Sequence, residues 1–192
     1  MNMRLRNFFI ALTWATFGPL AMGQGVAPLE SVANLDVPRY LGRWYEIAKF
    51  PNWFQKKCAA DTLADYSLRN DGRLEVVNQC RLANGEWEKA TGQARQIDGA
   101  QSARLQVRFA PAWLSFLPFV WGDYWVVDLD ERYELAAVSE PRREYLWILS
   151  RTPVVDPVRY AQLLARLQAM GLETDRLEKT TQSGRSVGQK NP

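Results

Sequence analysis

The chain has 192 residues, of which 12% are aromatic, and a formal net charge of +3. This length suffices for one domain with a sizeable core. The chain contains no histidine, which excludes Ser-His-Asp and Cys-His catalysis, H-E-x-x-H zinc sites and a haem held by a proximal histidine. A mechanism that uses only carboxylates or a lysine stays open.

The first predicted element is a secretory signal peptide over residues 1–23. Arg4 and Arg6 precede an apolar run over residues 8–17, and Ala21-Met22-Gly23 supplies a small-x-small cleavage site. The run is shorter than the roughly 20 residues that span a bilayer, which argues against the alternative of a membrane anchor. Loss of Arg4 and Arg6 brings the net charge close to neutral, so no basic footprint for nucleic acid remains.

Residues 41–152 show the pattern of strands separated by turns. Turn signals such as Asn70-Asp71-Gly72 and Asn84-Gly85 recur at short, regular spacing, which favours an antiparallel barrel or sandwich. Eight strands are predicted, over residues 42–50, 59–68, 73–81, 86–97, 103–109, 123–129, 133–139 and 145–152.

Cys58 and Cys80 are the only cysteines. An even pair in an exported chain predicts a disulfide. A hairpin centred near Asp71 places position 80 roughly opposite position 62. The bridge therefore requires the segment around Cys58 to leave the strand ladder and fold back. Two free thiols are the alternative.

The hydrophobic period changes to that of a helix after the last strand. Asp156 and Pro157 begin the predicted helix and Gly171 ends it. The stripe expected to pack on the outside of the barrel consists of Val158, Ala161, Leu164, Ala165, Leu167 and Gln168. Residues 179–192 are polar and contain Gly and Ser, and are predicted to form a disordered tail.

Three motifs, in order along the chain, resemble those of the lipocalin family and look most like its bacterial lipocalin and apolipoprotein D branch. Residues 41–47 contain a Gly-x-Trp sequence, residues 122–130 look like the second conserved region of the family, and residues 147–151 look like the third. The resemblance covers residues 35–178. It implies an all-β fold, namely an eight-stranded antiparallel up-and-down barrel with one C-terminal α-helix packed outside.

The same resemblance implies roles for three residues. Gly42 permits the tight start of the first strand, Trp44 plugs the closed end of the barrel, and Arg151 stacks over Trp44 as a cation on an aromatic face. Bacterial members are often outer-membrane lipoproteins, but no cysteine stands near the predicted cleavage site. We therefore expect an exported protein of the periplasm, soluble or peripherally associated with the outer membrane, and without an N-terminal lipid anchor.

An eight-stranded barrel has room for one small ligand. Alternate residues of a strand face inward, and an inward Trp44 sets the phase. The predicted ligand-binding wall is Glu46, Ala48, Phe50, Thr62, Ala64, Val76, Asn78, Leu105, Val107, Tyr124, Val126, Tyr145, Trp147 and Leu149. The facing of strand 123–129 stays open, because Trp125, Val127 and Leu129 make an equally apolar face.

Glu46 is an unusual residue for such a wall, because a carboxylate in an apolar cup is costly unless it is paired. An arginine, a tyrosine hydroxyl or a ligand headgroup could satisfy it. The alternatives are that a local twist turns Glu46 outward or that it is a paired structural residue.

Two loops, residues 51–57 and 111–121, are expected at the open end, and the second is unusually apolar for a loop. The predicted mouth and membrane contacts are Trp53, Phe54, Trp113, Leu114, Phe116, Phe119 and Trp121. Lys56 and Lys57 beside them suit a lipid headgroup surface. The loop over residues 110–121 could instead fold inward as a lid, and an apolar mouth could pair two copies in a homodimer.

The expected function is binding, storage or transport of a fatty acid, lysophospholipid or similar lipid in the bacterial cell envelope. No cofactor, metal, nucleic acid or enzymatic activity is expected. The alternatives are a lipid-modifying enzyme on the same barrel and a structural envelope protein that contacts a partner through its apolar mouth.

Overall fold

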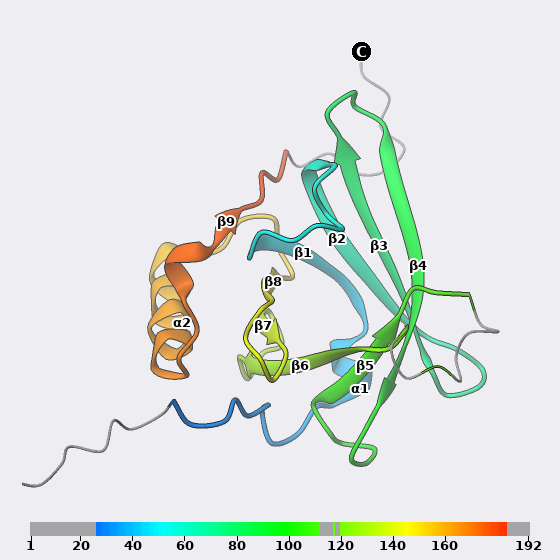
Figure 1. Cartoon of the computed structure of the whole chain (residues 1–192), viewed down its shortest axis with the longest axis vertical. Helices are drawn as coiled ribbons and strands as arrows, with labels where there is room; N and C mark the ends of the chain where they lie inside the picture. Colours follow the sequence, from blue (N-terminus) through cyan, green and yellow to red (C-terminus); the bar gives the residue numbers. More distant parts are fainter. Residues whose placement is uncertain (1–25, 112–116, 118–119, 184–192) are drawn as a thin grey trace, which may run out of the picture.

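A closed antiparallel barrel forms the body of the protein in a computed structural model that describes residues 26–111, 117 and 120–183 (Figure 1). Each strand pairs with its sequence neighbours, and β1 closes the ring by pairing with both β2 and β8. The strands are β1 Gly42–Lys49, β2 Cys58–Leu68, β3 Leu74–Leu82, β4 Trp87–Gln96, β5 Arg104–Arg108, β6 Gly122–Leu129, β7 Leu135–Ser139 and β8 Leu146–Ser150. The expected up-and-down barrel is confirmed.

Helix α2 (Pro157–Ala169) packs against the outside of the barrel, as expected (Figure 1). Asp156 caps it by accepting a hydrogen bond from the backbone N–H of Arg159 at 2.9 Å. Leu163 and Leu167 are fully buried, whereas Val158 is 63% exposed. The predicted apolar stripe was wrong in part, because it included Val158 and left out Leu163. A buried leucine removes more apolar area from water than a buried valine or alanine does, which favours the observed orientation of the helix.

Two apolar cores lie on the two sides of the barrel wall. The inner core lies on the inner face of the barrel and includes Trp44, Tyr66, Val76, Leu105, Val126 and Leu149. The outer core lies between the wall and α2 and includes Phe50, Val127, Ile148, Leu163 and Leu167. Successive side chains of a strand point to opposite faces, so they belong to the inner and the outer core in turn. Only the residues that face inward can line a ligand cavity.

A β-bulge in β1 moves the residues after Glu46 to the outer face. Glu46 lies opposite Leu149 of β8 and Ala48 lies opposite Ile148, which leaves Ile47 as an extra residue. One extra residue reverses the alternation, and both Ala48 and Phe50 are in the outer core. The prediction that Ala48 and Phe50 line the ligand wall is therefore wrong.

The predicted disulfide joins Cys58 to Cys80, whose Cα atoms are 5.5 Å apart. Cys58 does not leave the ladder as expected, since it pairs with Leu82 of β3. Two register shifts in β2, on either side of Ala60, move this end of the strand along β3 until the two cysteines are diagonal neighbours. Asp61 lies within this irregular stretch and has a φ of 54°.

Three short elements were not predicted: α1 (Val37–Tyr40), the 3-10 helix η3 (Thr174–Arg176) and β9 (Glu178–Lys179). β9 pairs with the end of β1. Thr180 then donates its backbone N–H to the Ile47 carbonyl at 2.9 Å, and Asp61 of β2 donates to the Thr181 carbonyl at 2.8 Å. We call residues 178–183 the C-terminal strap, because they bridge β1 and β2 where these strands no longer pair with each other.

The strap also corrects the expected tail. Residues 179–183 have defined hydrogen-bond partners on the barrel, so the expected disordered segment does not begin at residue 179. The rest of that segment, residues 184–192, and the expected signal peptide over residues 1–23 lie outside the described residues.

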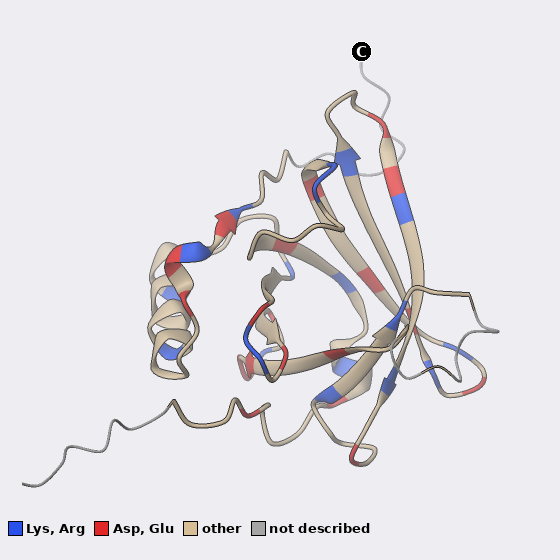
Figure 2. Ribbon diagram, in the orientation of Figure 1, with Lys and Arg blue, Asp and Glu red and all other residues tan. Residues whose placement is uncertain are grey.

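Basic and acidic residues are interspersed over the barrel, whereas the charged residues of α2 are both arginines (Figure 2). Arg166 of α2 contacts Asp128 of the barrel wall at 2.7 Å, and Arg159 contacts Asp130 at 2.7 Å. These pairs complement the apolar contact between α2 and the wall. Among the described residues, no helix is long and apolar enough to cross a bilayer.

Candidate functional site

The closed end of the barrel is built around Trp44, which is fully buried. The Cζ atom of Arg151 lies 3.9 Å from the centroid of the Trp44 ring. The Arg151 guanidinium donates to the carbonyls of Arg39, Arg43 and Tyr133 at 2.8, 2.8 and 3.1 Å. The expected cation–π pair is therefore present, and its cation is held by backbone oxygens.

Gly42 at the start of β1 has a φ of +91°, in the region that favours glycine. A Cβ atom at this position would lie 3.5 Å from Nη1 of Arg151. The backbone conformation, more than the available space, therefore requires glycine here.

Three tyrosine hydroxyls meet just inside the closed end. The Tyr124 hydroxyl lies 2.9 Å from that of Tyr40 and 2.8 Å from that of Tyr66. Burial raises the pKa of Tyr66 to about 12 and the pKa of the other two well above the usual value, so all three stay protonated. Three hydroxyl protons serve two mutual hydrogen bonds, which leaves one proton for another acceptor.

The barrel wall contains most of the predicted ligand-binding residues. Ala64, Val76, Leu105, Val126 and Leu149 are buried in the inner core, and Val107, Tyr124 and Trp147 pack against it half-buried. Asn78 faces Ala64 across the β2–β3 ladder, Thr62 is buried, and Tyr145 stacks on Trp147 with ring centroids 5.8 Å apart.

The open question of strand β6 is answered by the two cores. Val126 is fully buried in the inner core and Tyr124 packs against it, whereas Trp125 and Val127 belong to the outer core. A register shift between Val126 and Asp128 then lets Leu129 return to the inner side. The predicted facing of Tyr124 and Val126 is correct.

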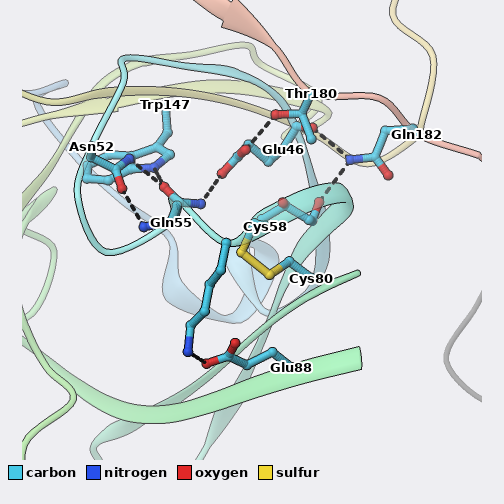
Figure 3. Close-up of a disulfide and its surroundings, with 11 residues drawn as sticks. Glu46, Asn52, Gln55, Cys58, Cys80, Glu88, Trp147, Thr180 and Gln182 are labelled. Atoms are coloured by element: carbon cyan, nitrogen blue, oxygen red, sulfur yellow. Dashed lines mark hydrogen bonds and ion pairs between the residues drawn. A yellow bond between two sulfur atoms is a disulfide. The ribbon is translucent and has the colours of Figure 1, made fainter. Parts of the chain in front are cut away.

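Glu46 is buried, with 3% of its surface exposed, and is paired within the protein (Figure 3). Gln55 donates its side-chain amide to Oε2 of Glu46 at 2.6 Å, and the Thr180 hydroxyl donates to Oε1 at 2.5 Å. Burial raises the pKa of the Glu46 carboxyl, and these two hydrogen bonds oppose that rise. Of the alternatives for Glu46, the geometry matches a paired structural residue.

The hydrogen bonds of Glu46 continue to both neighbouring segments (Figure 3). Gln55 Oε1 accepts from Trp147 Nε1 at 3.0 Å and from Asn52 Nδ2 at 2.6 Å. Gln182 of the strap donates to the carbonyls of Glu46 and Thr62. Glu46 thus joins the loop after β1, strand β8 and the C-terminal strap.

An aromatic cluster lies at the end of the barrel opposite Trp44. Phe54 contacts Tyr145 and Trp147, with ring centroids 5.8 and 6.2 Å away. Trp53 stands outermost, 73% exposed, and Phe54 is 43% exposed. Lys56 and Lys57 follow directly in the chain and are also exposed, and Lys57 pairs with Glu88.

The second predicted mouth segment is described only in part. Trp121 is half-buried beneath Arg95 and Arg108, whose Cζ atoms lie 4.2 and 5.1 Å from its ring centroid. Trp113, Leu114, Phe116 and Phe119 lie outside the described residues. The described mouth therefore consists of the loop after β1 and the start of β8.

Sequence reasoning missed Tyr40, Gln55 and Thr180 as parts of the two barrel ends. Tyr40 lies four residues before Trp44, and its carbonyl accepts from Trp44 Nε1 at 2.9 Å. That short spacing was a usable signal. Thr180 carried no such signal, because it lies 134 positions from the Glu46 it contacts.

Comparison with known proteins agrees with this geometry. A family model described as "Lipocalin-like domain" matches residues 35–182. The chain belongs to the lipocalin family. It is 43% identical over 157 residues to temperature-induced lipocalin-1 of Arabidopsis thaliana, covering 81% of this chain and 83% of that protein.

Further relatives place this lipocalin in the branch that its motifs resemble. It is 37% identical over 172 residues to the outer membrane lipoprotein Blc of Vibrio cholerae, covering 88% of this chain and 94% of that protein. It is 32% identical over 156 residues to mouse apolipoprotein D, covering 78% of both chains. Lobster apocrustacyanin A1 shares the fold, with a TM-score of 0.60 at 15% identity over 77% of this lipocalin and 80% of that chain.

Proposed function

We propose that this lipocalin binds, stores or transports a hydrophobic ligand, such as a fatty acid or lysophospholipid, in the bacterial cell envelope. Lipocalins bind small hydrophobic ligands. The observation that carries the proposal is the inner face of the barrel, where apolar side chains form a wall between the floor at Trp44 and the aromatic cluster at the opposite end.

An acyl chain suits such a wall energetically. Each buried methylene contributes about 0.8 kcal/mol, so a long chain offers on the order of 10 kcal/mol. The loss of translational and conformational freedom offsets several kcal/mol of that gain. The remaining proton of the tyrosine hydroxyls could bind an oxygen of the ligand at the floor.

Binding is favoured over catalysis as the role of the interior. The sequence has no histidine, and the buried carboxyl of Glu46 is already held by Gln55 and Thr180. Among the described residues, no group of three His, Cys, Asp or Glu side chains could hold a metal ion. A lipid-modifying enzyme would need reactive groups that the described wall does not bring together.

We propose that the protein is exported and meets the membrane peripherally through its aromatic end. The exposed Trp53 beside Lys56 and Lys57 suits the level of lipid headgroups. Its Vibrio cholerae relative is named an outer membrane lipoprotein.

Extraction of the purified native protein and mass spectrometry of the lipids that accompany it tests the function directly. A quantitative test is displacement of a fluorescent fatty acid from two matched variants. Val107→Trp enlarges a half-buried residue of the inner wall, and Val158→Trp enlarges an exposed residue of α2. We expect Val107→Trp to lower affinity about tenfold or more.

Val158→Trp should leave affinity unchanged, and thermal melting of both variants verifies that they fold. Equal affinity in the wild type and both variants would contradict binding inside the barrel. It would favour the structural envelope protein that contacts a partner through its mouth.

A further inference from the structure

A groove of about 280 Å³ lies at the barrel wall, where β5 ends. Its lining comes from the turn after β2, from β3 and β4, and from the last residue of β5 and the segment after it, and comprises Arg69, Glu75, Thr91, Gly92, Gln93, Arg108, Phe109, Ala110 and Pro111. Strand neighbours of these residues, such as Val76, Ala94 and Val107, face the inner core. By alternation, Glu75, Gln93 and Arg108 face outward, whereas Gly92 pairs with Val76 and lies against Phe109 on the inner face, so the groove spans the edge of the wall beside the end of β5.

Arg108 is an unusual residue for this groove, because only 3% of its surface is exposed. Its guanidinium donates to neutral oxygens, the Pro111 carbonyl at 2.6 Å and Gln93 Oε1 at 2.8 Å. Its Nε atom is buried and has no hydrogen-bond partner among the described residues. All Asp and Glu residues are described, and none of them forms an ion pair with Arg108.

A buried guanidinium without a counter-charge is costly. The other charges of the groove do not remove that cost. Arg69 pairs with Glu75 at 3.6 Å and with Asp71 at 3.5 Å. The lining contains two basic residues, Arg69 and Arg108, and one acidic residue, Glu75. Because Glu75 pairs with Arg69, the positive charge of Arg108 is the one that stays unbalanced.

The groove also offers neutral hydrogen-bond donors. Thr91 contributes an exposed hydroxyl. Gln93 has its Oε1 occupied by Arg108, which fixes the amide and leaves its NH₂ group as a donor. Phe109, which is 45% exposed, forms an apolar margin beside these polar groups. Cationic and neutral donors next to an apolar margin match the headgroup region of an anionic amphiphile.

We propose that this groove binds a phosphate or carboxylate group, with Arg108 as its counter-charge. The anion could be the headgroup of a membrane lipid or a free anion in solution. A lipid headgroup would deepen the proposed function, because it would give the protein a second contact with an anionic membrane, separate from its aromatic end. To that extent the inference rests on the proposed function.

The test compares three glutamine variants of arginines. Arg108→Gln removes the proposed counter-charge, and Arg69→Gln removes the other cation of the groove. Arg104→Gln is the matched control, because Arg104 lies on the same strand and the same outer face but outside this groove. Binding is measured by co-sedimentation with phosphatidylcholine vesicles that contain or lack phosphatidylglycerol, and by thermal melting in titrations with inorganic phosphate.

We expect Arg108→Gln to weaken binding to the phosphatidylglycerol vesicles about tenfold or more, because a charge-assisted contact is lost. Arg69→Gln should have a smaller effect in the same direction, and Arg104→Gln should change affinity by less than about threefold. A phosphate-induced rise in melting temperature that Arg108→Gln abolishes would identify a free anion as the source. Sensitivity only on vesicles would identify a lipid headgroup.

The proposal is overturned if Arg108→Gln and Arg69→Gln bind both probes as tightly as Arg104→Gln. If Arg108→Gln does not fold, Arg69→Gln and Thr91→Val decide the matter, since both positions are exposed. Displacement of a fluorescent fatty acid is measured on the same proteins. If the wild type binds anionic vesicles through Arg108 but binds no fatty acid, the proposed function is refuted and the anion-binding role of the groove is supported.

Discussion

The two ends of the barrel are closed by different means. At the closed end, Trp44 and Arg151 pack face to face, and the cation is held by three backbone carbonyls. At the opposite end, the buried carboxyl of Glu46 gathers side chains from the loop after β1 and from the C-terminal strap. Only the second arrangement depends on a group that changes charge in the acid range.

This difference shows how stability and adaptability are divided within one small barrel. Backbone carbonyls cannot be titrated and hardly move, so the closed end provides a fixed floor. The opposite end relies on side-chain hydrogen bonds and a disulfide, and its aromatic residues Trp53 and Phe54 remain partly exposed. A ligand that enters there would meet the part of the molecule that opens locally at a lower free-energy cost.

The largest expected effect is at the closed end. Trp44→Ala removes a fully buried indole, so we expect the free energy of unfolding to fall by about 3–5 kcal/mol. Urea denaturation measures this change. Trp53→Ala is the matched control at the opposite end, and its 73% exposure predicts a change within about 0.5 kcal/mol. Similar losses in both variants would mean that the two ends contribute equally.

The disulfide at the opposite end should have the next largest effect. Cys58→Ser combined with Cys80→Ser releases a loop with a sequence separation of 22, which we expect to lower the free energy of unfolding by about 3 kcal/mol. Urea denaturation with and without a reductant measures it. The double variant should not respond to the reductant, and a wild type equally indifferent to it would refute a stabilising role.

The smallest expected effect is a pH dependence at Glu46. Its pKa in the folded protein is raised above the ordinary value of 4.5, by burial. The folded state therefore binds this proton more tightly than the unfolded state does. Its contribution to stability is fully present below pH 4.5 and is lost as the pH rises through the folded pKa. The wild type should thus lose stability relative to Glu46→Gln as the pH rises.

Asp61 provides the control for this pH dependence, because the shift of its pKa has the opposite sign. Burial raises its pKa, but hydrogen bonds from Ser183 and Arg81 outweigh burial and lower it below 3.8. Its contribution is present above pH 3.8 and is lost as the pH falls through the folded value. Asp61→Asn should therefore differ most from the wild type above pH 3.8. Parallel pH profiles for both variants would contradict this assignment.

The closed end could be predicted from the sequence because its parts lie in short motifs. The roles of Gly42, Trp44 and Arg151 were implied by the resemblance of their motifs to those of the lipocalin family, and the structure brings the three residues together as expected. Strand positions followed from turn signals for the same reason.

The opposite end could not be predicted in the same way. The bulge at Ile47 places Ala48 and Phe50 outside the barrel, and alternation alone gives no sign of it. Of the two partners of the Glu46 carboxyl, Thr180 comes from a polar segment that the composition marked as disordered. Both features arise from contacts between distant segments, which a pattern of neighbouring residues does not encode.

The C-terminal strap also bears on the order in which the protein is made. A chain emerges from the ribosome N-terminus first, yet the gap between β1 and β2 is bridged by residues 178–183. During synthesis, the ends of these two strands therefore present unpaired backbone groups until the strap has emerged. Such an edge can pair with other chains.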